Sequence, residues 1–81
     1  MTDQTKPQTH LDLKGLLCPM PVVKISQAIK TVPVGATIEA VASDAGVVAD
    51  IPAWARSSGN ELVTMEKVND KEFRFVVRRL K

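Results

Sequence analysis

Cys18 is the residue of this chain that is best suited to chemistry. It is the only cysteine among 81 residues, so the chain cannot form an internal disulfide or supply a four-ligand metal cage from thiolates. The sequence of residues 18–21 is CPMP, and it opens a stretch with helical periodicity. We therefore expect one sulfur nucleophile that reacts with something outside the chain. We expect no metal and no bound cofactor.

The stretch after Cys18 has the pattern of an amphipathic helix. At about 100° per residue, one side of a helical wheel collects five apolar side chains: Val22, Ile25, Ala28, Ile29 and Val32. The pattern predicts a helix over residues 19–31. Pro19 and Pro21 suit its first turn, where backbone N–H groups have no partner within the helix. Cys18 would then be the N-cap, and the helix dipole would favour its thiolate form.

Two interpretations of Cys18 compete. A free cysteine is often a small buried hydrophobic residue, but the flanking prolines and the cap position favour a functional thiol that is held outward. Val23 falls on the polar side of the predicted helix, and Met20 lies close to the thiol. These two apolar side chains could form a docking surface for a partner protein.

Composition limits the class of protein. Residues 10–81 suffice for one small domain, and 44% of the chain is hydrophobic. Residues 1–9 are polar and lack the apolar segment of a signal peptide, so we expect a flexible N-terminal tail. We expect no membrane segment, because no apolar run is long enough. A single unpaired cysteine fits the reducing cytoplasm. The net charge of +2 is too weak to indicate nucleic-acid binding by itself.

The remaining patterns predict the order βαβαββ. Alternating apolar residues predict strands over residues 10–14, 36–43, 62–68 and 72–80, with a tight turn at residues 69–70. A second helix is expected over residues 50–58, with Asp50 as its N-cap. The first βαβ unit should be parallel and right-handed. These elements predict an α/β two-layer sandwich, in which both helices cover one face of a four-stranded mixed sheet.

A longer motif surrounds the thiol. Residues 11–21 (LDLKGLLCPMP) match the signature L-D-x-x-G-L-x-C-P-x-P, and residues 50–54 (DIPAW) and 59–62 (GNEL) fit the same pattern. From about His10 to the C-terminus the chain resembles the TusA family of sulfur-carrier proteins, also called SirA-like or YhhP-like. The resemblance implies the same two-layer sandwich. It also implies that Cys18 accepts a sulfane sulfur and carries it as a persulfide.

The resemblance also implies partners. The sulfur donor would be a cysteine desulfurase or a rhodanese-type protein, and the acceptor another protein thiol. The chain would act stoichiometrically, as a sulfurtransferase-type carrier in tRNA thiolation, molybdenum-cofactor supply or sulfur oxidation. Two departures from relatives are visible: Ala45 stands where many have proline, and Ala55 where some have a second cysteine.

Supporting roles are expected for residues around the thiol. Pro19 and Pro21 would stiffen the approach to Cys18, and Asp12 would support the loop into Gly15. Gly15 would provide a backbone angle that other residues avoid. His10, the only histidine, is assigned no role.

An alternative function is a regulatory or RNA-binding module. It would use the open sheet face and the C-terminal arginines, Arg74, Arg78 and Arg79. Aromatic residues make up only 4% of the chain, and Phe73 and Phe75 should face inward, so a base-stacking surface is missing. A thiol enzyme would need a histidine partner or a resolving cysteine. This chain has no second cysteine, and its one histidine is not a plausible partner for Cys18. We therefore expect a monomeric sulfur carrier that binds no nucleic acid stably.

Overall fold

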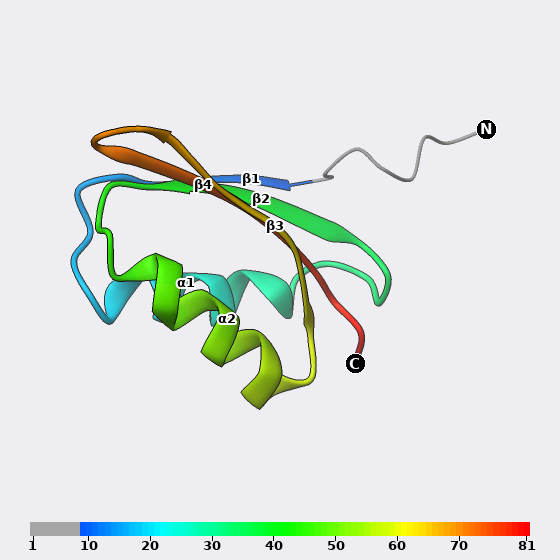
Figure 1. Cartoon of the computed structure of the whole chain (residues 1–81). Coiled ribbons are helices and arrows are strands. Elements are labelled where there is room, and N and C mark those ends of the chain that lie inside the picture. The colour runs from blue at the N-terminus through cyan, green and yellow to red at the C-terminus, as the bar shows by residue number, and fades with distance from the viewer. Residues whose placement is uncertain (1–8) are drawn as a thin grey trace.

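The computed structural model describes residues 9–81 and has the element order βαβαββ (Figure 1). The elements are β1 (Thr9–Leu13), α1 (Met20–Ile29), β2 (Thr37–Ala42), α2 (Val47–Ser58), β3 (Glu61–Asn69) and β4 (Glu72–Arg78). The predicted order is confirmed. The predicted tail lies outside the described residues except for Thr9, with which β1 begins. No helix in the described part of the chain is both long and apolar enough to cross a membrane.

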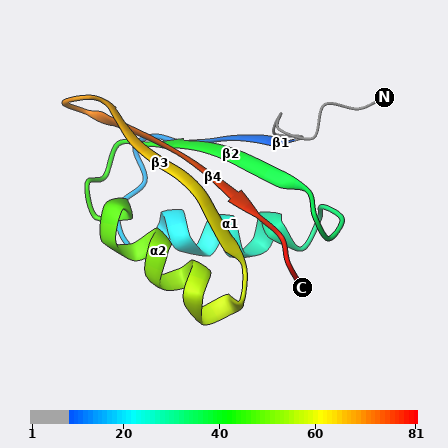
Figure 2. The same ribbon diagram turned by 45° about the vertical axis from the view of Figure 1, so that its right-hand side comes forward.

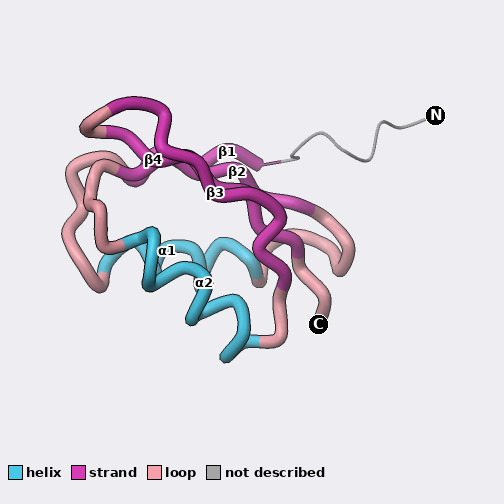
Figure 3. Tube along the Cα trace, viewed as in Figure 1, coloured by secondary structure: helices cyan, strands magenta, loops and turns pink. Residues whose placement is uncertain are grey.

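One mixed sheet forms the first layer and the two helices form the second. The strand order is β1-β2-β4-β3. β1 and β2 are parallel, while β4 runs antiparallel to both β2 and β3. Figures 1 and 2 show α1 and α2 side by side under the same sheet face, and Figure 3 shows the strand layer above the helix layer. The predicted two-layer sandwich is therefore confirmed.

Small and large side chains alternate in the core between the layers. Ala40 of β2 lies opposite Phe75 of β4, and both are fully buried. Ile25 of α1 and Ile51 of α2 reach the same cluster from below. The short alanine side chain leaves room for the phenyl ring, as close packing at crystal-like density requires.

The first helix begins later than predicted. α1 starts at Met20, its N-cap is Pro19, and the Cys18–Pro19 peptide bond is cis. The Met20 N–H donates to the Leu17 carbonyl at 2.8 Å, so it is not free for the sulfur. The prediction that Cys18 is the N-cap was therefore wrong, because a separate turn over residues 17–20 precedes the helix.

The second helix begins earlier than predicted. α2 starts at Val47 with Gly46 as N-cap, so Asp50 lies in its first turn and Pro52 inside the helix. The N–H groups of Val47 and Val48 donate to carbonyls three residues back, which makes this a tight first turn. Val47 and Ile51 are both buried one turn apart. The helix extends back to Val47 because burial of this side chain offsets the cost of having Pro52 inside the helix. The sequence pattern alone did not show this burial.

The uncovered face of the sheet carries an ion-pair network around Glu39. Its carboxylate lies 2.5 Å from His10 Nδ1 and accepts a hydrogen bond from Arg74 Nε. Arg74 also reaches Glu66 at 3.5 Å. Burial raises the pKa of Glu39, but the hydrogen bonds and charges of Arg74 and His10 outweigh it and hold the pKa below its ordinary value. His10, which we expected to have no role, therefore has a structural partner.

Candidate functional site

The thiol lies at the edge of the sheet where two parallel strands end. Leu13 of β1 pairs with Ala42 of β2, so the loops that follow them leave the sheet side by side. Figure 1 shows both loops at one end of the molecule, each leading into the N-terminus of a helix. Cys18 lies in the first loop and is exposed. This edge is the usual position for a site in an α/β fold.

Hydrogen bonds hold the first loop in place. The Lys14 N–H donates to Asp12 Oδ1 at 3.0 Å, and the Gly15 N–H donates to Ser43 Oγ at 2.8 Å. Gly15 has φ +85, in the left-handed region that favours glycine. Asp12 and Gly15 thus shape the turn that leads to the thiol. The Ser43 contact, which joins the two loops, was missed by the sequence analysis.

Two carboxylates hold Cys18 itself. The Cys18 N–H donates to Asp44 Oδ2 at 2.7 Å, and the thiol Sγ donates to Asp50 Oδ2 at 3.0 Å. Asp44 also accepts the Gly46 N–H at 3.0 Å, and these two backbone hydrogen bonds lower the pKa of Asp44. The sequence analysis missed both roles. The parallel pairing of β1 with β2 was the available signal, because it brings the Asp44 loop beside Cys18.

The carboxylates reverse the expected effect on the thiol. The hydrogen bond to Asp50 is the largest cause, followed by desolvation and then the negative charges of Asp50 and Asp44, and together they raise the pKa of Cys18. We predicted a thiolate favoured by a helix dipole. That prediction was wrong, because α1 begins two residues after Cys18 and the thiol instead donates a hydrogen bond to the Asp50 carboxylate. The raised pKa favours the protonated form of the thiol.

Exposed apolar residues lie close to Cys18 in the sequence. Met20 is 39% exposed and Val23 is 37% exposed, so both predicted docking residues are accessible. Leu17 is 72% exposed and directly precedes Cys18, yet the sequence analysis gave it no docking role. Pro19 is exposed beside the thiol, whereas Pro21 is fully buried and belongs to the core.

This arrangement suits sulfur exchange with a large partner. The thiol is open to solvent, its proton has an acceptor in Asp50, and apolar residues close to it in the sequence are exposed. Thiol–disulfide-type displacement depends on access to the attacking sulfur. Within residues 9–81, no three His, Cys, Asp or Glu side chains gather as metal ligands would.

Comparison with known proteins gives the family. The family model described as Sulfurtransferase TusA matches residues 9–79. The chain is 46% identical over 56 residues to YrkF of Bacillus subtilis, a candidate sulfur carrier protein; the match covers 69% of this chain and 30% of YrkF. It is 38% identical to a candidate sulfur carrier protein of Archaeoglobus fulgidus, over 88% of this chain and 96% of that protein.

A third relative is the sulfur carrier protein TusA of Allochromatium vinosum. It is 32% identical over 70 residues, which cover 86% of this chain and 91% of that protein. The chain spans only 30% and 38% of the length of the longer relatives in Bacillus subtilis and Aquifex aeolicus. The family match covers nearly all described residues, from the first residue of β1 to Arg79, just beyond β4. The chain therefore belongs to the TusA family of sulfur-carrier proteins.

Proposed function

We propose that this chain carries a sulfane sulfur on Cys18, as a persulfide, from a donor protein to an acceptor protein. The observation that carries the proposal is the exposed Cys18 thiol, which hydrogen bonds hold to the loop that follows the neighbouring parallel strand. Membership of a sulfur-carrier family supports it. A cysteine desulfurase or a rhodanese-type protein is the donor, and the exchange takes place in the cytoplasm.

Loading begins with loss of the Cys18 proton, for which Asp50 Oδ2 is the nearest acceptor at 3.0 Å. The thiolate then attacks the outer sulfur of the donor persulfide. A new S–S bond forms on Cys18, the old S–S bond breaks, and the donor leaves as a thiolate. Because the carboxylate of Asp50 raises the pKa of Cys18, the thiolate that attacks is formed more readily once a partner protein changes this contact.

Unloading is the same displacement in reverse. The acceptor thiolate attacks the outer sulfur, its persulfide forms, and Cys18 leaves as a thiolate that takes up a proton beside Asp50. Leaving groups with a higher pKa leave more slowly. The carboxylate of Asp50 therefore makes release depend on proton return, which an acceptor protein can supply when it covers the site.

A labelled-sulfur experiment tests the proposal. The chain is incubated with a cysteine desulfurase and cysteine bearing labelled sulfur, separated from the donor, and mixed with reduced glutathione. We expect label on the wild-type chain, none on Cys18→Ser, and release of the label as glutathione persulfide. Label that never binds, or that binds equally to Cys18→Ser, would contradict the proposal.

The RNA-binding or regulatory alternative is not favoured, because its arginines are occupied. Arg74 binds Glu39 and Glu66, and Arg78 Nη1 donates to Glu61 Oε1 at 3.1 Å. Arg79 Nη1 donates to the Val32 carbonyl at 2.8 Å and holds the C-terminal segment against the loop after α1. These guanidinium groups already have acceptors within the chain.

A further inference from the structure

A groove between α1 and α2 leads away from the thiol. Its near end is a hollow of about 410 Å³ that includes Cys18, Val22 and Asp50. Its far end is a hollow of about 300 Å³ at the C-terminal ends of both helices, which includes Lys30 and Lys81. Trp54 lines both hollows, so they are neighbours along the seam between the two helices, and we call this row of two hollows the groove.

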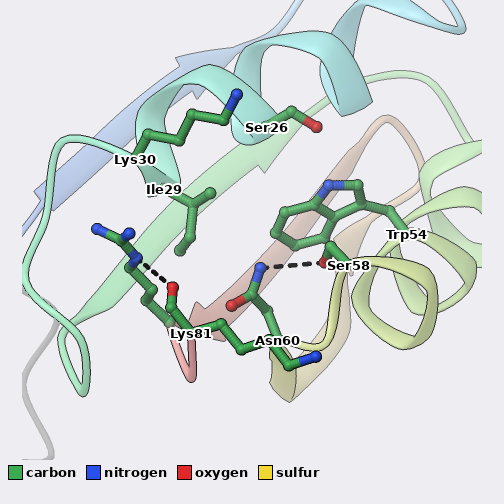
Figure 4. A pocket seen from close by; sticks show the side chains of 8 residues that line it. Ser26, Ile29, Lys30, Trp54, Ser58, Asn60 and Lys81 are labelled. Atoms are coloured by element: carbon green, nitrogen blue, oxygen red, sulfur yellow. Dashed lines mark hydrogen bonds between the residues drawn. The ribbon is translucent and has the colours of Figure 1, made fainter.

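The far hollow is lined by two apolar side chains, by cations, and by the polar residues Ser26, Ser58 and Asn60. Figure 4 shows the indole of Trp54 beside Ile29, with the Lys30 ammonium above and the Lys81 side chain below. Within residues 9–81, neither Lys30 nor Lys81 has a carboxylate within 4.0 Å. The stem of Lys81 lies over Gly59, where an added Cβ would come within 2.7 Å of it. Two cations therefore remain available to a ligand.

The two ends of the groove have opposite charge. Asp50 is in contact with the thiol at the near end, with Asp44 beside it. Lys30 and Lys81 lie at the far end, and Arg79 forms part of the wall while its guanidinium donates to the carbonyls of Val32 and Lys81. A ligand that fills the groove should be neutral beside Cys18 and acidic beyond Trp54, since charge complementarity fixes orientation and register.

We propose that this groove binds an extended, acidic segment of a sulfur-relay partner, the segment that carries the partner's reactive cysteine. The inference rests on the proposed carrier function and adds the chemistry of the partner. α1 has 10 residues, so at 1.5 Å per residue the groove runs about 15 Å. An extended chain covers that length in about five residues. The acidic side chains should therefore lie about five residues from the partner's cysteine.

A designed peptide tests this proposal without any sulfur transfer. The probe is a capped octapeptide with serine at position one, in place of the cysteine, aliphatic residues at positions three and four, and glutamates at the last three positions. Trp54 is the only tryptophan, so its fluorescence reports binding along the groove. A second peptide with glutamine in place of each glutamate is the control ligand.

Charge reversal on α1 provides matched variants. Lys30→Glu removes a cation from the far hollow, whereas Lys24→Glu makes the same change on the same helix in a hollow beside β1. We expect the acidic peptide to bind wild type roughly tenfold more tightly than the glutamine peptide, and Lys30→Glu to remove that difference. Lys24→Glu should remain within about twofold of wild type, apart from weak long-range charge effects.

Other outcomes would overturn the proposal. These are absence of saturable binding, equal affinity for both peptides, and equal effects of Lys30→Glu and Lys24→Glu. A single-stranded RNA oligonucleotide that displaces the acidic peptide with higher affinity would also overturn it, since the cations would then serve phosphates. Loading of Cys18 from a small polysulfide is measured in parallel. If loading fails while the acidic peptide binds, the carrier function fails and the groove stands as an acidic-peptide site.

Discussion

Gly15→Ala tests whether the left-handed turn before the thiol is a structural requirement. Gly15 has φ +85, and a Cβ added there would meet no atom within 4 Å. The cost of the substitution is therefore conformational and does not arise from a clash. A residue with a Cβ pays roughly 1–2 kcal/mol in the left-handed region.

Gly46→Ala is the matched control. Gly46 has φ −58, which suits any residue, and the nearest atom to an added Cβ is 3.4 Å away. Both substitutions reduce the freedom of the unfolded chain by a similar amount, worth about 0.4–1 kcal/mol. This contribution cancels in the comparison, so the two variants should differ in stability by the left-handed cost alone, roughly 1–2 kcal/mol.

Urea unfolding followed by Trp54 fluorescence measures that difference. We expect Gly15→Ala to unfold at lower urea than wild type, and Gly46→Ala at the same or higher urea. By thermal unfolding, each kcal/mol should shift the midpoint by about 4–8 °C in a domain of this size. Equal midpoints for the two variants would show that the loop relaxes freely, and would refute the view that Gly15 fixes the backbone before Cys18.

Three further predictions concern the thiol, the exposed apolar residues near it in the sequence, and the uncovered sheet face. Asp50→Asn should lower the pKa of Cys18, since it removes the carboxylate that is the main cause of the raised pKa. Alkylation of the Cys18 thiol at pH 7 should therefore become faster. An unchanged dependence of the alkylation rate on pH would contradict this. Leu17→Ser combined with Met20→Ser should slow transfer to a protein acceptor by roughly fivefold or more but leave loading from a small polysulfide unchanged; equal slowing of both reactions would argue against docking. The lowered pKa of Glu39 means that its ion pairs stabilise the fold above the ordinary glutamate pKa of about 4.3, and that this stability is lost as pH falls through the lower folded value. The free energy of unfolding of Glu39→Gln should therefore fall less on acidification than that of wild type, by about 0.5–1 kcal/mol. Urea titrations at stepwise lower pH measure this difference. An equal loss of stability in both proteins would contradict the ion-pair network around Glu39.

The sequence predicted the fold because its patterns are local. The alternation of Phe73, Phe75 and Val77 determines the buried face of β4, and the helical spacing of Ile25 and Ile29 determines that of α1. The helix starts were less predictable. They depend on burial of Val47 and on the turn over residues 17–20, and both are tertiary effects that override local preference.

The candidate site was predicted only in part. Cys18 and Gly15 were identified from residue type and spacing, whereas the partners of the Cys18 amide and of its thiol lie 26 and 32 residues away in the sequence. No local pattern predicts that Asp44 binds the Cys18 amide or that Asp50 accepts the thiol proton. The sign of the pKa change depends on these long-range contacts, and an argument from the helix dipole alone therefore gave the wrong direction.

Intact-protein mass spectrometry after incubation with a persulfide donor shows directly whether Cys18 takes up sulfur. We expect the wild-type chain to gain the mass of one or more sulfur atoms and a reductant to remove that mass. Cys18→Ser should gain none under the same conditions. A folded wild-type chain with a reactive thiol that gains no sulfur from several donors would contradict the assignment of Cys18 as a sulfur carrier.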